Sequence, residues 1–172
     1  GLILAVAGEA TETFITQAAQ GFAGAASGVM LTPELPKHLD SGVKHLTDQG
    51  AELLARGVES TEAGARGRPA LLRIAGAAFV ANPNGFQNEM FGPASLIVVA
   101  ADEAELLAVG AQLHASLTCS FYTAADGADD ALYDQLLPII AQKSGRILND
   151  KMPTGVAVSP AMVHGGPFPA GG

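Results

Sequence analysis

The sequence predicts an α/β protein with a mainly parallel, layered sheet and flanking helices. Short continuous apolar runs, typical of strands that are buried on both faces, alternate with longer segments in which apolar residues recur every three to four positions. Strands that are separated by helices of this length tend to pair in parallel. The 172 residues suffice for one domain with a sizeable core, and we expect residues 1–172 to form it.

The chain begins with an apolar run at residues 2–6, which predicts the first strand. In the next segment, Phe14, Ala18 and Phe22 recur every four residues, a spacing that predicts an amphipathic helix over residues 9–26. Two glutamates fall in its first turn, where the positive end of the helix dipole favours negative charge.

A second amphipathic pattern predicts a helix from about residue 37 to residue 55, with Gly57 as its C-terminal cap. Its inward-facing residues are expected to be Leu39, Val43, Leu46 and Leu53. The segment 58–69 lacks periodicity and predicts a surface loop. Two apolar runs, 71–74 and 96–100, predict further strands.

The remaining expected elements are a helix over 103–114, a strand over 116–124, a helix over 129–145 and a strand over 146–149. Asp102 and Glu105 form the D-x-x-E start of a capping box before the first of these helices. Alternation in the strand that follows turns Cys119 inward, and Pro138 is expected to bend the second helix, which Gly145 stops.

Charge and hydropathy exclude two classes of partner. The formal net charge is −8 and the nine basic residues are scattered, whereas nucleic-acid binding needs clustered Lys and Arg. No apolar stretch approaches the roughly 20 residues that a membrane span needs.

No signal peptide is recognised, and a single cysteine suits a reducing cytoplasm. Only 15% of residues are charged, which indicates either a compact α/β core or a surface that another segment or subunit covers.

No residue in the sequence stands out as a nucleophile or a metal ligand. Cys119 is the only thiol, and its inward phase predicts a core residue. His38 and His45 share a helix face but lie two turns apart, and no H-E-x-x-H or cysteine pair is present, so no metal site is expected. The glycine-rich segment 21–28 ends a helix instead of opening one, so it does not predict a phosphate loop.

The stretch NEMFGPAS, residues 88–95, combines a carboxylate, an aromatic ring and a stiff Gly-Pro corner. The carboxylate of Glu89 could accept two hydrogen bonds from a ribose diol, and Phe91 could offer a flat face to a nicotinamide ring. The alternative is a solvated glutamate beside a core phenylalanine at the entry of a strand.

The order E-x-F-G-P before an apolar strand resembles a signature of the aldehyde dehydrogenase superfamily. In that family the Glu binds the nicotinamide ribose and the Phe packs against the nicotinamide. The C-terminal stretch GRILNDKMPTGVAVSPAMVHGGPFPAGG is similar to the α-ketoglutarate semialdehyde (2,5-dioxopentanoate) dehydrogenase branch. The start, GLILAV with a helix and VMLTPEL, resembles the segment that directly follows the catalytic cysteine there.

The resemblance implies that the chain is the C-terminal part of a catalytic domain, without the nucleophile segment and most of the cofactor-binding domain. The catalytic cysteine is then expected just upstream of Gly1. Glu89 and Phe91 would contact NAD or NADP, and Phe168 would line the aldehyde pocket. Asp150, with Lys151 after it, departs from the family's usual Asn-Gly turn.

The implied reaction is the oxidation of a semialdehyde to a carboxylic acid through a cysteine thioester, with a hydride passing to NAD(P)⁺. The chain by itself is expected to be inactive, and its parent to be a homo-oligomer. The alternative is a free-standing α/β module that binds a nucleotide or a protein and has no catalytic activity.

Overall fold

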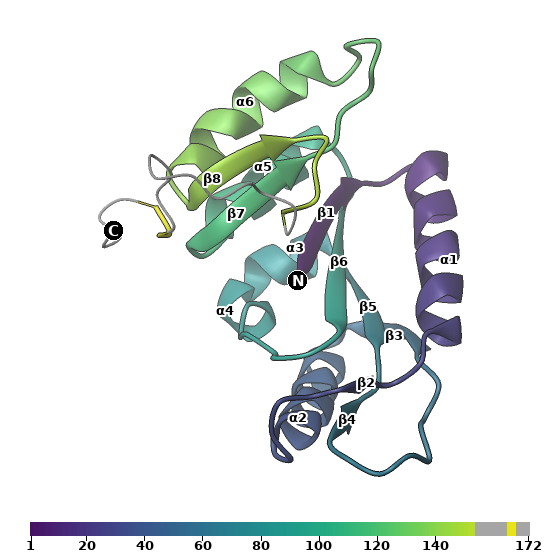
Figure 1. The fold of residues 1–172 in the computed structure, drawn as a ribbon. Coiled ribbons are helices and arrows are strands. Elements are labelled where there is room, and N and C mark those ends of the chain that lie inside the picture. The colour runs from purple at the N-terminus through teal and green to yellow at the C-terminus, as the bar shows by residue number, and fades with distance from the viewer. Residues whose placement is uncertain (154–164, 168–172) are drawn as a thin grey trace. The chain divides into compact units, whose positions relative to one another are not determined.

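The computed structural model describes residues 1–153 and 165–167 and divides the chain into two compact units. The first unit comprises residues 1–106 and the second residues 107–172. Each unit combines helices with a sheet (Figure 1). The predicted α/β class is therefore confirmed.

The first unit is built on a four-stranded sheet in the order β1-β6-β5-β3. Its strands are β1 (Leu2–Val6), β3 (Glu52–Arg56), β5 (Ala70–Ala75) and β6 (Ala94–Ala100). β6 is parallel to both β1 and β5, and β3 joins the edge antiparallel to β5, so the sheet is mainly parallel as predicted. β1 was predicted to be buried on both faces, but it lies at the sheet edge and its side chains stay partly exposed.

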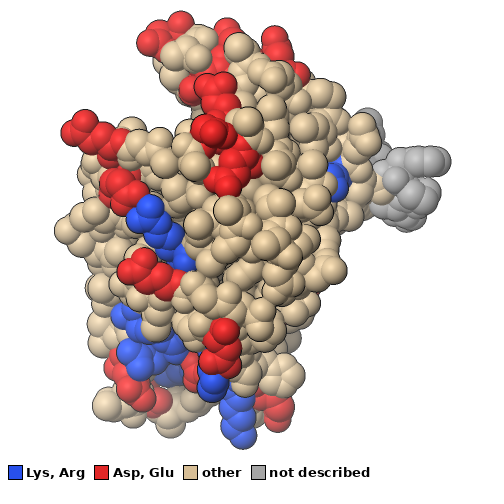
Figure 2. Space-filling view, turned by 180° about the vertical axis from the view of Figure 1, so that it is seen from behind, with Lys and Arg blue, Asp and Glu red and all other residues tan. Residues whose placement is uncertain are grey.

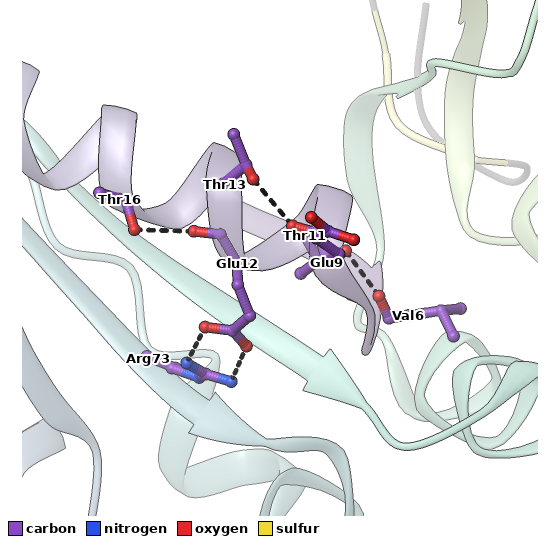
Figure 3. Close-up of polar contacts among 7 residues, drawn as sticks. All are labelled: Val6, Glu9, Thr11, Glu12, Thr13, Thr16 and Arg73. Atoms are coloured by element: carbon purple, nitrogen blue, oxygen red, sulfur yellow. Dashed lines mark hydrogen bonds and ion pairs between the residues drawn. The ribbon is translucent and has the colours of Figure 1, made fainter.

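Helix α1 (Glu9–Gly24) covers one face of this sheet. Ile15 is buried there against a cluster on three strands, which consists of Ala55, Leu71, Ile97 and Val99. Phe14, which was predicted to face inward, is 44% exposed, because the contact stripe of the helix is centred on Ile15 and not on Phe14. The carboxylate of Glu12, one turn before Thr16, accepts two hydrogen bonds from Arg73 of β5 (Figure 3).

Two short helices, α3 (Gly76–Ala81) and α4 (Pro83–Phe86), lie on the other side of the sheet from α1 (Figure 1). Phe79 of α3 is fully buried and stacks on Phe86 of α4 with ring centroids 6.1 Å apart.

Helix α2 (Leu35–Asp48) ends earlier than the amphipathic pattern predicted. Leu39, Val43 and Leu46 are buried as expected. Gly50, with φ +97°, takes the left-handed conformation that commonly ends a helix, and the chain then enters β3. Leu53 therefore belongs to a strand and is 41% exposed, and Gly57 follows that strand instead of capping the helix.

The predicted loop over 58–69 contains one short strand, β4 (Arg66–Gly67), which pairs antiparallel with β2 (Gly28–Val29). In the ranges that the structure describes, no helix is both long enough and apolar enough to cross a membrane.

The boundary between the two units falls within α5 (Glu103–Gln112). The predicted N-terminal cap is present, because Asp102 Oδ1 accepts a hydrogen bond of 2.8 Å from the Glu105 amide. The return bond differs from that of a capping box, because the Glu105 carboxylate accepts it from the amide of Ala101, one residue before the cap.

In the second unit, β7 (Ser116–Phe121) and β8 (Ser144–Asn149) pair in parallel, with α6 (Asp130–Ala141) between them in sequence. The predicted helix over 129–145 was too long, because residues from Ser144 onward pair with β7. Leu117, which shares the predicted inward phase of Cys119 two residues later, is 58% exposed.

Candidate functional site

Residues Glu89–Pro93, called the corner below, connect α4 to β6 and have a fixed backbone. Gly92 has φ +142°, a conformation that residues with a Cβ rarely adopt. The carbonyl of Pro93 accepts a hydrogen bond of 2.9 Å from the Ala70 amide of β5, and the carbonyl of Gly92 accepts one of 2.9 Å from Ala94. The corner is thus tied to the sheet on the side that enters β6.

Both chemically interesting side chains of the corner face solvent in the first unit. Phe91 is 62% exposed, so it is not a core residue, and Glu89 is also exposed. Phe91 is one of the residues that line a shallow apolar hollow of about 370 Å³. The other residues that line this hollow come from the corner, from the segment around β2 and from the first residue of α2, and are Gly28, Val29, Met30, Leu31, Leu35, Gly92 and Pro93.

Parallel pairing places the corner beside the first residue of the chain. The Gly1 amino group donates a hydrogen bond of 2.8 Å to the Ala94 carbonyl, and the Leu96 amide donates one of 2.9 Å to the Gly1 carbonyl. Burial lowers the pKa of the Gly1 amino group, and the nearby Glu89 carboxylate acts in the opposite direction. Glu89 therefore lies close to the point where β1 begins.

The two exposed side chains of the corner have the chemistry that the sequence prediction requires. An exposed ring next to a Gly-Pro backbone leaves a flat apolar surface on which a planar ring can stack. An exposed carboxylate can accept both hydrogen bonds of a ribose diol. Glu89 and Phe91 are the residues that could hold a nicotinamide riboside here.

Sequence reasoning did not find the residues that line the hollow with Phe91. Val29 is 74% exposed and Leu31 is 92% exposed, which is unusual for two large apolar side chains so close in sequence. The sequence signal that could have found them is the apolar run VML at residues 29–31, shortly after the first predicted helix. This run belongs to no periodic pattern that would predict a core.

The structure offers little support for other catalytic or metal sites. Burial raises the pKa of the Cys119 thiol, which keeps it protonated and weakly nucleophilic at neutral pH. No group of three His, Cys, Asp or Glu side chains that could hold a metal ion occurs in residues 1–153 and 165–167. Phe168, the expected pocket residue, lies outside the described residues.

Most basic side chains on the face shown in Figure 2 lie next to acidic ones, and one lies among uncharged residues. The ion pairs of the first unit include Arg56 with Asp40, Arg66 with Glu62, and Arg68 with Glu59.

The chain is similar in sequence to two curated bacterial enzymes, although no family model matches it. It is 40% identical over 171 residues to α-ketoglutaric semialdehyde dehydrogenase 2 of Azospirillum brasilense and 34% identical over 171 residues to α-ketoglutaric semialdehyde dehydrogenase of Acinetobacter baylyi. Each match covers 99% of this chain and 32% of the relative, so the chain spans about a third of the length of these relatives.

The fold leads to the same group of proteins. The structure matches succinic semialdehyde dehydrogenase of Streptococcus pyogenes, solved in complex with NADP⁺, with a TM-score of 0.72 and 15% sequence identity. The match covers 96% of this chain and 35% of that one. Over nearly its whole length the chain is similar in sequence to about a third of these aldehyde dehydrogenases, and its fold matches the corresponding share of a solved one.

Proposed function

We propose that the chain is part of an NAD(P)-dependent aldehyde dehydrogenase that oxidises a semialdehyde, α-ketoglutarate semialdehyde, to the carboxylic acid. The substrate is inferred from the names of the two curated relatives. The observation that carries the proposal is the parallel pairing of β1 with β6, which sets the corner beside Gly1. The family resemblance puts the nucleophile just upstream of Gly1, so the corner and the nucleophile would adjoin.

Each corner residue has a defined task in this proposal. The Glu89 carboxylate accepts hydrogen bonds from the two hydroxyls of the nicotinamide ribose. The exposed face of Phe91 packs against the nicotinamide and limits its rotation. The cofactor, NAD⁺ or NADP⁺, supplies the oxidising power by accepting a hydride. Positioning of this kind raises the rate because the reacting atoms are held at the distance that transfer requires.

The remaining machinery lies outside the described residues. The catalytic cysteine and most of the cofactor-binding domain would precede Gly1 in the full-length protein. Phe168 would line the aldehyde pocket. On this proposal residues 1–172 complete a single catalytic domain only together with the missing segments, and the chain alone does not turn over any aldehyde.

The test is an assay of the full-length protein with α-ketoglutarate semialdehyde and each cofactor, beside the chain alone. We expect turnover only with the full-length protein. Glu89→Gln should raise the KM for the cofactor on the order of tenfold, because one charged hydrogen-bond acceptor is lost. The matched control is Glu52→Gln, which changes an exposed carboxylate on β3.

Two results would contradict the proposal. One is aldehyde oxidation by residues 1–172 alone, and the other is an unchanged cofactor KM and kcat in the Glu89→Gln enzyme. A third variant, Phe168→Ala, separates the two sites, because it should raise the KM for the aldehyde and leave the KM for the cofactor as it is.

A further inference from the structure

Met90, the residue between Glu89 and Phe91, packs into a notch on helix α2. The notch exists because Gly42 has no side chain. A Cβ added to Gly42 would lie 2.5 Å from Met90 Cγ, and closer still to its sulfur, but at an ordinary 3.6 Å from Met90 Cβ. The terminal part of the Met90 side chain thus occupies the space that an alanine methyl at position 42 would need.

Gly42 is an unfavourable residue for its position in secondary structure. It lies in the interior of α2, which spans Leu35–Asp48, and glycine is one of the weakest helix formers. Its neighbour Val43 and the preceding Leu39 are buried, so this part of the helix packs against the rest of the unit. A glycine here is explained by the close approach of Met90.

The far end of the corner is held in a similar way. A Cβ on Gly92 would lie 3.0 Å from Met30 Cε and 3.1 Å from a methyl group of Leu39. Leu39 is fully buried and comes from the same helix as Gly42. Both ends of the corner therefore rest on α2. Met90 is partly buried while its neighbours Glu89 and Phe91 are exposed.

We propose that Gly42 and Met90 are positioning residues for the cofactor: the Met90 side chain, seated in the Gly42 notch, fixes the direction in which Glu89 and Phe91 face outward. The expected change in cofactor KM rests on the proposed function. The expected effect on the orientation of Glu89 and Phe91 rests on packing alone.

A double-mutant cycle on the full-length protein tests the pair. Gly42→Ala should displace Met90 and raise the KM for the cofactor by about tenfold or more, since small misplacements of positioning groups have effects of this order. The KM for the aldehyde should stay unchanged, whereas general loss of folded protein would lower the apparent kcat and leave both KM values alone.

The second arm of the cycle removes the clash. In a Met90→Ala background, the alanine methyl groups at positions 42 and 90 would meet at the ordinary contact distance of 3.6 Å, so Gly42→Ala should then cause no further rise in cofactor KM. Met90→Leu, which keeps the volume of the side chain, should retain a cofactor KM within about threefold of the unaltered protein. Gly21→Ala is the matched control, because Gly21 also lies within a helix and a Cβ there meets nothing within 4 Å.

The outcome separates this inference from the proposed function. If Glu89→Gln raises the cofactor KM but Gly42→Ala does not, or if Gly42→Ala acts equally in both backgrounds, the positioning role is wrong. If Glu89→Gln itself has no effect, the proposed function fails, and amide hydrogen exchange decides about the notch. In that case Gly42→Ala should speed amide exchange at residues 89–92 when Met90 is present, but not in the Met90→Ala background. If Gly42→Ala changes the exchange rates by the same factor in both backgrounds, the inference is wrong.

Discussion

The ion pair between Glu12 and Arg73 offers a test of how α1 is held on the sheet (Figure 3). Arg73 Nη1 and Nη2 lie 2.9 Å and 2.6 Å from the two carboxylate oxygens of Glu12. Arg73 is opposite Ile97 in the ladder and two residues from Leu71, so its stem runs along the apolar face that α1 covers. Removal of Glu12 would leave the guanidinium beside that face without its acceptor.

The expected cost follows from how far the pair is buried. An exposed pair contributes about 0.2–1 kcal/mol, and loss of one partner from a fully buried pair costs about 3–5 kcal/mol. The Arg73 side chain is 29% exposed and the Glu12 side chain 52%, so solvent screens much of the interaction. We therefore expect Glu12→Ala to lower the local free energy of opening by about 1 kcal/mol.

Amide hydrogen exchange in α1 and β5 measures this loss, because it reports opening free energies element by element. The control is Glu9→Ala, which removes another carboxylate from the first turn of α1 and so has a similar effect on the helix dipole. Adding Arg73→Leu to Glu12→Ala should recover stability, since an apolar side chain suits that face. If Glu12→Ala and Glu9→Ala change the exchange rates equally, the bidentate pair does not hold α1 as argued.

Three further predictions concern single residues. Because burial raises the pKa of the Cys119 thiol, iodoacetamide should alkylate it more slowly at pH 8 than it alkylates free cysteine, and mild denaturant should remove the difference. Asp150 has φ +53°, so Asp150→Gly should raise the thermal midpoint, with a gain of up to about 1 kcal/mol in the free energy of unfolding. A Cβ on Gly76 would lie 2.7 Å from Glu105 Oε2, so Gly76→Ala should displace the carboxylate that accepts the Ala101 amide hydrogen bond. We expect a cost of about 1 kcal/mol, visible as faster hydrogen exchange in the first turn of α5.

Local sequence signals predicted β1, β5, β6, β7 and β8 and the four longer helices where the signals and the packing agree, but they missed β2, β3, β4, α3 and α4. The apolar runs at 71–74 and 96–100 became β5 and β6, the two inner strands of the four-stranded sheet. The capping pattern at Asp102 marked the start of α5, because side chains satisfy the free amides there by purely local hydrogen bonds.

The errors arose where tertiary pairing decided the outcome. Leu46 and Leu53 are seven residues apart, which suits one helix face, so the pattern ran across Gly50. The edge of β5 accepts a partner strand in the register Leu53↔Leu72, and this pairing turned the end of the predicted helix into β3. A pattern of apolar residues in a single segment carries no information about an unfilled sheet edge elsewhere.

In the candidate site too, local features could be predicted from the sequence and contacts between distant segments could not. Glu89 and Phe91 could be proposed from a short motif, because side-chain chemistry and a Gly-Pro turn are written in the sequence. The contact between Met90 and Gly42 could not, since it joins residues 48 positions apart and depends on the packing of α2. The sequence also left open whether Phe91 is buried, and the structure shows that it is 62% exposed.

The position of the corner beside Gly1 depends on the register between β1 and β6. The ladder pairs Ile3 with Ile97 and Leu4 with Val98, so apolar side chains meet on both faces of the sheet. A slip of β6 by one residue would shift the strand by about 3.3 Å along its axis and exchange its two faces. Ile97 and Val98 are both fully buried, so such a slip would disrupt the core on both sides at once. Core packing of β6 thus sets the distance between the start of β1 and the carboxylate that we propose holds the cofactor.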